Sequence, residues 1–196
     1  MGTDTRLQIL RAAEKLFAAH GLDGVSLREI NRAAAQSNTG AVQYHFGDRD
    51  GLIRAVVDRH RMDSEPRRHA LLDQYEDNGQ PDLHALAAAL VYPIAAKLHD
   101  PDGGLDYLQV ACEHYSRPRS FEQFFPKRDP NNSMERWNKL LDELDPTPPA
   151  SSRTAAIRFT FVELARRAAS RRRSDDRAFV RHLTDMVAAV LGVQER

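Results

Sequence analysis

Side chains of the types that bind metals or catalyse reactions are seldom grouped in this sequence. Cys112, Glu113 and His114 are consecutive and include three kinds of metal ligand. Consecutive residues of a helix point about 100° apart, so these three side chains cannot converge on one ion. The sequence has no HExxH motif, paired CxxC, glycine-rich phosphate loop or nucleophile elbow. We therefore predict no metal site, no cofactor and no enzymatic activity.

A second kind of chemistry is indicated by "NTGAVQYHF" at residues 38–46, followed by "GDRDGL". The stretch contains a helix-capping residue, a glycine and two amides, so it is too polar for a buried helix. Tyr44 and His45 are side chains that commonly contact phosphate, whereas Phe46 is better interpreted as a core anchor of a small domain. These residues are candidates for contact with a nucleic acid.

The charge of the whole chain neither supports nor excludes such a partner. Lys and Arg total 28, as do Asp and Glu, but binding to nucleic acid requires only a local basic face. The run "RRAASRRR" at 166–173 could bind nucleic acid or a membrane surface. We prefer a solvated helix end, where cations interact favourably with the helix dipole.

The elements that must position these residues are all helices. Gly21 ends a first helix from about residue 4 to 20, and Ser26 with Glu29 forms a capping box for a second. Asn38 caps a short third helix and Asp48 a fourth. Pro66 starts a helix or kinks one. Further helices are predicted at about 83–99 with a kink at Pro93, 105–115, 134–144, 152–172 and 176–191, with a connector at 117–132. The fold class is all-α.

The composition indicates a folded protein of the cytoplasm. The chain is 41% apolar and 29% charged, which is typical of globular proteins. Its single cysteine, Cys112, excludes an internal disulfide and favours a reducing compartment. No leader and no membrane-spanning segment is recognisable, because Pro93 and Lys97 interrupt the longest apolar run.

Three short helices with a tight turn between the second and third are typical of a helix-turn-helix, whose last helix enters the major groove. The segments "ILRAAEKLFAAHGLDGVSLREINRAAA" and "GAVQYHFGDRDGL" resemble the tetracycline-repressor-like (TetR) family of bacterial transcription regulators. The resemblance implies a dimeric repressor that binds a palindromic operator in double-stranded DNA and is released by a small-molecule effector. We predict a DNA-binding domain at 1–48, with homology to about 62, and a ligand-binding and dimerisation domain at 49–196.

The resemblance also assigns roles to residues of the first domain. Ser26 matches the cap of the second helix, Gly40 the glycine of the recognition helix, and Arg49 a cation that grips phosphate. Two positions depart from the family, because Gln36 replaces the turn glycine and Gln43 a frequent tyrosine. Gln43 can read adenine or bind a phosphate. The predicted DNA contacts are Arg28, Asn38, Thr39, Gly40, Ala41, Gln43, Tyr44, His45 and Arg49.

The last two helices carry apolar residues on more than one face, which indicates more than one partner. Together with the resemblance, this predicts a four-helix interface between two copies of the chain. The alternative is that both helices pack only within one chain. The predicted interface residues are Ile157, Phe161, Leu164, Phe179, Leu183, Met186, Val187 and Val190.

An effector pocket is expected among the helices between residues 83 and 144, where large apolar and polar aromatic groups are mixed. The candidate lining residues are Tyr92, Tyr107, His114, Tyr115, Phe125 and Trp137, although each could instead fill the core. The effector would be moderately apolar, since no cluster of one charge sign stands out there. The alternative function is a helical enzyme or small-molecule carrier with a vestigial DNA-binding head.

Overall fold

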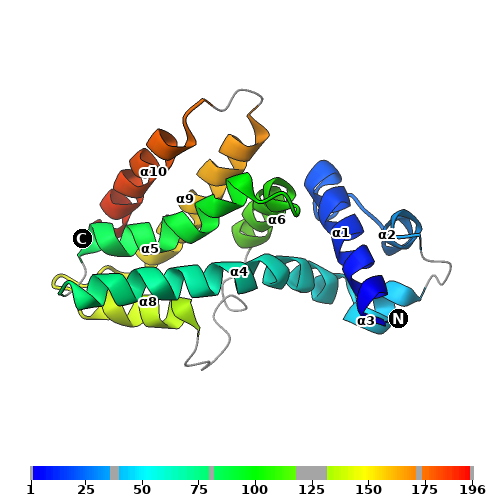
Figure 1. Ribbon diagram of the computed structural model, residues 1–196, viewed down its shortest axis with the longest axis horizontal. Coiled ribbons are helices and arrows are strands. Elements are labelled where there is room, and N and C mark those ends of the chain that lie inside the picture. The colour runs from blue at the N-terminus through cyan, green and yellow to red at the C-terminus, as the bar shows by residue number, and fades with distance from the viewer. Residues whose placement is uncertain (1, 36–39, 80–81, 118–131, 171–173, 195–196) are drawn as a thin grey trace.

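The computed structural model describes residues 2–35, 40–79, 82–117, 132–170 and 174–194. Every regular element in these ranges is a helix, which confirms the all-α prediction. Figure 1 shows a small group of helices, α1 to α3, at one end of the molecule and a larger helical body at the other. The long helix α4 runs from the small group, here called the head, into the body.

The head consists of α1 (Gly2–His20), α2 (Leu27–Ala33) and α3 (Ala41–Phe46). Ile9, Ala13 and Phe17 recur at helical spacing on α1 and are almost fully buried. Gly21 ends α1 with φ of 79°, a left-handed angle that glycine adopts without a steric penalty. These residues form the core against which α2 and α3 are placed.

The predicted capping box at the start of α2 is confirmed. The Ser26 hydroxyl accepts a hydrogen bond from the Glu29 N–H at 3.2 Å, and Glu29 Oε2 accepts one from the Ser26 N–H at 2.7 Å. After α2, Ala35 adopts φ of 52°, which costs an alanine about 1–2 kcal/mol. We expected the unusual backbone angle at Gln36, which lies outside the described residues.

Helix α4 (Arg49–Asp77) connects the head to the body over 29 residues. The carboxylate of Asp48 caps it, accepting a hydrogen bond from the Gly51 N–H at 2.7 Å, as predicted. Pro66 lies inside this helix, so the alternative in which it begins a new helix is wrong. One end of α4 packs on α1 and α3, and the remainder packs on α5, α6 and α8.

The body is built around α5 (Leu83–Ala95), which continues as the 3₁₀ helix η1 (Ala96–His99). Most of α5 is buried, because α4, α8, α9 and α10 pack around it. The surrounding helices are α6 (Gly104–Ser116), α8 (Ser133–Asp142), α9 (Ala150–Ala169) and α10 (Asp176–Leu191). Figure 1 shows α4 between α5 and α8. The predicted connector at 117–132 lies almost wholly outside the described residues.

Candidate nucleic-acid interface

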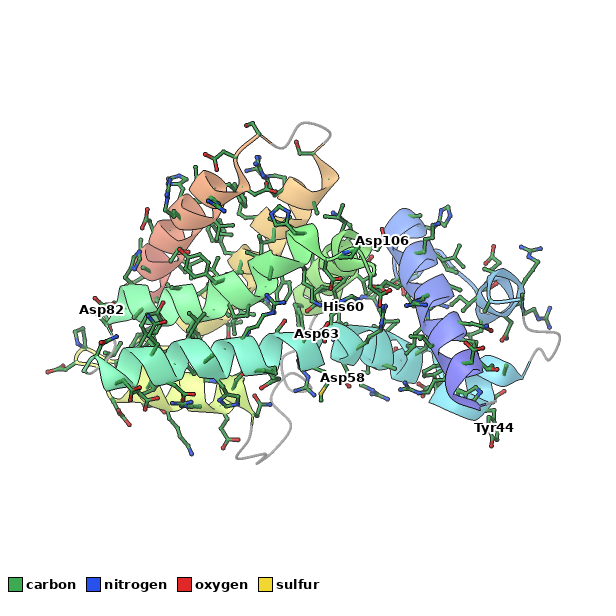
Figure 2. The ribbon with its side chains drawn as sticks, in the orientation of Figure 1. Tyr44, Asp58, His60, Asp63, Asp82 and Asp106 are labelled. Atoms are coloured by element: carbon green, nitrogen blue, oxygen red, sulfur yellow. The ribbon has the colours of Figure 1, made fainter. Side chains whose placement is uncertain are left out.

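Helix α3 presents one apolar side to the head and one polar side to solvent. Val42 is only 1% exposed and anchors the inner side, whereas Gln43 and Tyr44 are exposed. The ring of Tyr44 is 85% exposed, an unusual state for a large aromatic side chain. In Figure 2, Tyr44 lies at the outer edge of the head and points away from it. The outer side of α3 can therefore reach a partner without rearrangement of the head.

The predicted DNA contacts differ in how exposed they are. Arg28, Gln43 and Tyr44 are exposed, and His45 is half-buried, with its ring edge-on to Tyr44 at 5.0 Å. Gly40 is half-buried and is the N-cap of α3, which corrects the prediction that Asn38 caps this helix. The prediction for the side chain of Ala41 is corrected, because that side chain is 7% exposed and belongs to the core.

Two predicted contacts lie outside the described residues, and the neighbouring Phe46 packs as expected. Asn38 and Thr39 fall outside the described residues, so their predicted contacts are not tested. Phe46 packs against the head core, in agreement with its interpretation as an anchor. The guanidinium of Arg6 lies 5.2 Å from the centre of the Phe46 ring. Arg6 is exposed beside α3 and adds a cation that the sequence analysis missed, since α1 carried no signal of proximity to α3.

Arg49 makes contacts inside the head that the resemblance did not imply. Its Nη2 donates hydrogen bonds to the carbonyls of Leu22, at 2.7 Å, and of Val25, while Nε donates to Leu22 at 3.1 Å. The guanidinium also lies 5.9 Å from the centre of the Phe17 ring. Two of its three nitrogens thus hold the loop between α1 and α2. Arg49 is thus an internal clamp, and its contact with phosphate stays a prediction.

Three aromatic residues of the predicted effector pocket are core residues. Tyr107, Tyr115 and Trp137 are each 3% exposed or less. The Trp137 Nε1–H donates to the Leu86 carbonyl at 2.7 Å, and the Tyr115 ring packs on that of Phe161 at 4.6 Å. These three side chains pack in the core of the body, which corrects the prediction that they line an effector pocket. Phe125 lies outside the described residues.

The other two described candidates for the effector pocket, His114 and Tyr92, are less buried than these three. His114 is half-buried, and burial lowers the pKa of its imidazole below the ordinary value. Tyr92 is 40% exposed and borders an open groove of about 840 Å³ between the end of α5, η1 and the start of α10. Leu98 and Val180 supply apolar walls of this groove, and its charged lining residues carry both signs: Asp175, Asp176, Arg177 and Arg181.

Some of the predicted dimer residues on α9 and α10 face the core of the single chain, and others are partly exposed. Five of them are 1% exposed or less within the single chain, so their side chains have no surface left for a partner. This part of the prediction is corrected for Ile157, Phe161, Leu164, Leu183 and Val187. Phe179, Met186 and Val190 are only partly buried, and Val162, which we did not select, is 41% exposed.

Two further groups of the body are of types that bind metals or act as nucleophiles. Within the described residues, the ligand atoms of His60, Asp63 and Asp100 come within 4.8 Å of one another. The ammonium of Lys97 lies 2.8 Å from Asp63 and 2.7 Å from Asp100 and so already supplies the positive charge; we assign no metal ligand here. Burial raises the pKa of the Cys112 thiol, which disfavours a reactive thiolate.

The fold and the exposed short helix define a helical protein with an N-terminal helix-turn-helix head. Residues 9–56 match the family model described as bacterial regulatory proteins, tetR family. The head of this chain is thus similar to the N-terminal region of TetR-family regulators. Within the described residues, no helix combines the length and the apolar character needed to cross a membrane.

Relatives and solved structures agree with the assignment. The chain is 36% identical over 112 residues to the HTH-type transcriptional repressor Rv1474c of Mycobacterium tuberculosis, covering 55% of this chain and 59% of that protein. It is 29% identical over 131 residues to the HTH-type transcriptional repressor AcnR of Corynebacterium efficiens, covering 67% of this chain and 60% of that protein. The chain thus spans three-fifths or less of the length of the curated relatives it matches.

The structural similarity to known proteins extends beyond the head. The crystal structure of NalD, the secondary repressor of the MexAB-OprM multidrug efflux pump in Pseudomonas aeruginosa, superposes with a TM-score of 0.58. The match covers 95% of this chain and 94% of NalD at 20% sequence identity. This similarity shows that head and body together have a fold like that of NalD.

Proposed function

We propose that this protein is a dimeric transcription regulator that represses its target genes by binding a palindromic operator through α3. The repressor relatives and the similarity of the head to TetR-family regulators support the proposal. Its site of action is the cytoplasm, where bacterial DNA lies. Under this proposal the protein has no catalytic role.

The observation that carries the proposal is the outward projection of Gln43 and Tyr44 from α3. Gln43 has both a donor and an acceptor and can form paired hydrogen bonds to adenine in the major groove. Tyr44 extends a hydroxyl that can bind a phosphate or a base edge. The exposed guanidinium groups of Arg28 and Arg32 on α2, and of Arg6 on α1, can neutralise phosphates beside them.

The experiment is selection of bound sequences from a random DNA pool, followed by retardation assays with the selected site. Gln43→Ala should change the preferred sequence, at a cost of about 1–3 kcal/mol if Gln43 reads a base. Arg28→Ala should weaken binding to all sequences and reduce the salt dependence by about one phosphate contact. Met62→Ala is the control, because Met62 is 63% exposed but lies on α4, outside the interface. Absence of any enriched sequence would refute the proposal.

The dimer part of the proposal rests on the outer side of α9 and α10. Val162, with the half-buried Met186 and Val190, leaves apolar surface that a second copy can cover. Two copies joined there would present two α3 helices to one operator. Successive major grooves are about 34–36 Å apart, so dimerisation multiplies contacts that are too few in one head.

The effector part of the proposal rests on the groove bordered by Tyr92. Its volume suits a small molecule, and its lining of apolar residues with arginines and aspartates of both charge signs favours a moderately apolar body with a polar group. A library of such compounds should contain members that raise the melting temperature and release DNA. Val180→Trp should reduce both effects by filling the groove, while Leu105→Trp, on α6, should not.

A further inference from the structure

The head is joined to the body by more than the continuous helix α4. Helix α6 lies beside α1, and both of these helices also pack on α4 (Figure 1). Pro66 stands inside α4 and has no N–H to donate to the carbonyl of Met62, one turn earlier. A helix bends more easily at such a position. The orientation of the head on the body therefore also depends on the contacts of α1 with α6.

The first of these contacts lies just before α6, in the loop that follows η1, one side of the proposed effector groove. The Asp102 carboxylate pairs with Arg11 of α1 at 3.1 Å and also with Arg59 of α4. Arg59 Nη1 in turn donates to Glu14 Oε2 at 2.5 Å. Glu14 is 2% exposed, and a Cβ atom on Gly103, which has φ of 85°, would come within 2.9 Å of its Oε2. We call Arg11, Glu14, Arg59, Asp102 and Gly103 the loop contact.

The charged groups of the loop contact satisfy one another. Two guanidinium groups, of Arg11 and Arg59, face the carboxylates of Glu14 and Asp102. The other oxygen of Glu14 lies 2.5 Å from Nε2 of His60, which also belongs to α4. Hydrogen bonds from Arg59 and Arg11 lower the pKa of Asp102 below its ordinary value. Asp102 is therefore ionised at neutral pH, and it binds α1 and α4 to the loop there.

The second contact lies at the other end of α6. Glu113 Oε2 accepts a hydrogen bond from the Leu22 N–H at 2.8 Å, and Glu113 Oε1 accepts one from Arg117 at 3.0 Å. Arg117 also pairs with Asp23 at 2.8 Å. Leu22 and Asp23 lie in the loop after α1, so both belong to the head. We call Leu22, Asp23, Glu113 and Arg117 the helix-end contact.

Leu22 is bound from both sides. Glu113 of α6 accepts from its N–H, and Arg49 of α4 donates to its carbonyl. The residue is fully buried, and a buried N–H that loses its acceptor carries a penalty in free energy. The helix-end contact therefore places the loop after α1 by a specific hydrogen bond, and not by apolar packing alone.

The two contacts lie at opposite ends of one helix. From Gly104 to Glu113 the rise of an α-helix amounts to roughly 14 Å. One contact alone would let α1 turn about that point. Two contacts at this separation fix the direction of α1 along α6, so the head keeps one orientation while both are made.

We propose that α6 sets the orientation of the head through these two contacts, and that Asp102 and Glu113 are positioning residues for recognition of a palindromic operator. This inference rests on the proposed function, because the orientation of each head sets the distance and the rotation between the two α3 helices of a dimer. One base pair added between the half-sites moves them apart by about 3.4 Å and rotates one against the other by about 35°. Heads of fixed orientation cannot follow this change, whereas mobile heads can.

The orientation of the head is measured with two spin labels in the full chain. Cys112→Ser removes the native thiol, and Ala33→Cys and Lys139→Cys place labels at exposed positions on α2 and α8. Labelled chains are diluted with unlabelled ones, so that only distances within one chain are measured. The distance distribution should be narrow in this parent protein. It should be broader after Asp102→Ala or Glu113→Ala and broadest in the double variant.

The variants are chosen so that the core stays intact. The side chains of Asp102 and Glu113 are 54% and 40% exposed. Glu113→Gln keeps an oxygen that accepts from the Leu22 N–H and should retain the narrow distribution, which separates loss of this hydrogen bond from loss of the charge. Asp185→Ala is the control, because it removes a carboxylate of α10 that is 64% exposed and pairs with His84. It should leave the distribution unchanged.

The second measurement uses the DNA site selected from the random pool, with its half-sites moved apart or together by one base pair. For the parent protein and for Asp185→Ala, the affinity should fall at least about tenfold when the spacing changes. For the double variant of Asp102 and Glu113, the loss should be about threefold or less. The affinity for one isolated half-site should be equal in all of these proteins, because α3 is unchanged.

The proposal is overturned if the distance distribution of the double variant is as narrow as that of the parent protein. It is also overturned if the double variant loses as much affinity as the parent when the spacing changes. Failure to select any DNA site would instead refute the proposed function. The distance distributions would then still decide whether α6 positions the head.

Discussion

Replacing Arg49 by alanine is expected to weaken the head itself. The guanidinium satisfies the carbonyls of Leu22 and Val25, which lie in the loop between α1 and α2. Loss of a donor to such partly buried carbonyls costs about 1–3 kcal/mol. The free energy of unfolding of Arg49→Ala, measured with denaturant in the absence of DNA, should fall by that amount.

Arg28→Ala is the control for this measurement. Arg28 is exposed, and surface substitutions of this kind usually change stability by less than about 0.5 kcal/mol. If the two variants were equally stable and only Arg49→Ala lost salt dependence in DNA binding, the internal clamp would be unimportant. Arg49 would then be a phosphate contact, as the resemblance first implied.

The roles of single residues were predictable only where they depend on near neighbours in sequence. The pairing of Ser26 with Glu29 is a local pattern, and the structure confirms it. The clamp made by Arg49 joins residues more than twenty positions apart, and nothing in the spacing reveals it. The burial of Ala41 was equally hidden, because a six-residue helix shows too few turns to define its inner face.

At the scale of helices, α2 should depend on its N-terminal cap. Ser26→Ala removes the side-chain acceptor for the Glu29 N–H, and loss of such a cap costs about 1 kcal/mol. Ser26→Thr keeps a hydroxyl and should cost much less. Thermal unfolding of the three proteins checks this order. Equal melting temperatures for Ser26→Ala and Ser26→Thr would show that the cap is not needed.

The boundaries of the helices were predicted well because caps and breakers are encoded locally. The predicted final helix and the cap of α4 by Asp48 match the structure. The sequence did not show whether a helix continues through Pro66 or begins there. A proline can be tolerated inside a helix when tertiary packing holds the residues on both sides of it. The buried and the partner-facing sides of the helices were harder to predict, because an apolar residue such as Phe161 suits a core and an interface equally.

For the whole molecule, alkaline pH should act through two buried tyrosines. Burial raises the pKa of Tyr107 and of Tyr115 in the folded protein above the ordinary value. Their contribution to stability is present below about pH 10, the pKa of an unfolded tyrosine, and is lost as the pH rises above it. The tyrosinate absorbance of these two should therefore appear together with unfolding.

Replacing one tyrosine of the buried pair tests this prediction directly. Tyr107→Phe should remove part of the dependence of the unfolding free energy on alkaline pH. A single absorbance step for all five tyrosines, well before unfolding, would contradict the burial of the pair.

The oligomeric state should respond to one substitution on the outer side of α9. Val162→Glu places a charge in the proposed interface and should give monomers in sedimentation. Leu105→Glu introduces the same charge at a position of similar exposure, 37%, on α6 and should leave the dimer intact. A Val162→Glu protein that remained dimeric would place the interface elsewhere.

The tight fit of Gly103 over Glu14 has a consequence for genetics. Any other residue there meets the left-handed backbone angle and must displace the Glu14 carboxylate, which disturbs the contacts of Glu14 with Arg59 and His60 of α4. Such a substitution leaves the surface of α3 untouched. A genetic screen for loss of the response to the proposed effector should therefore return substitutions of Gly103, which lies far along the chain from α3.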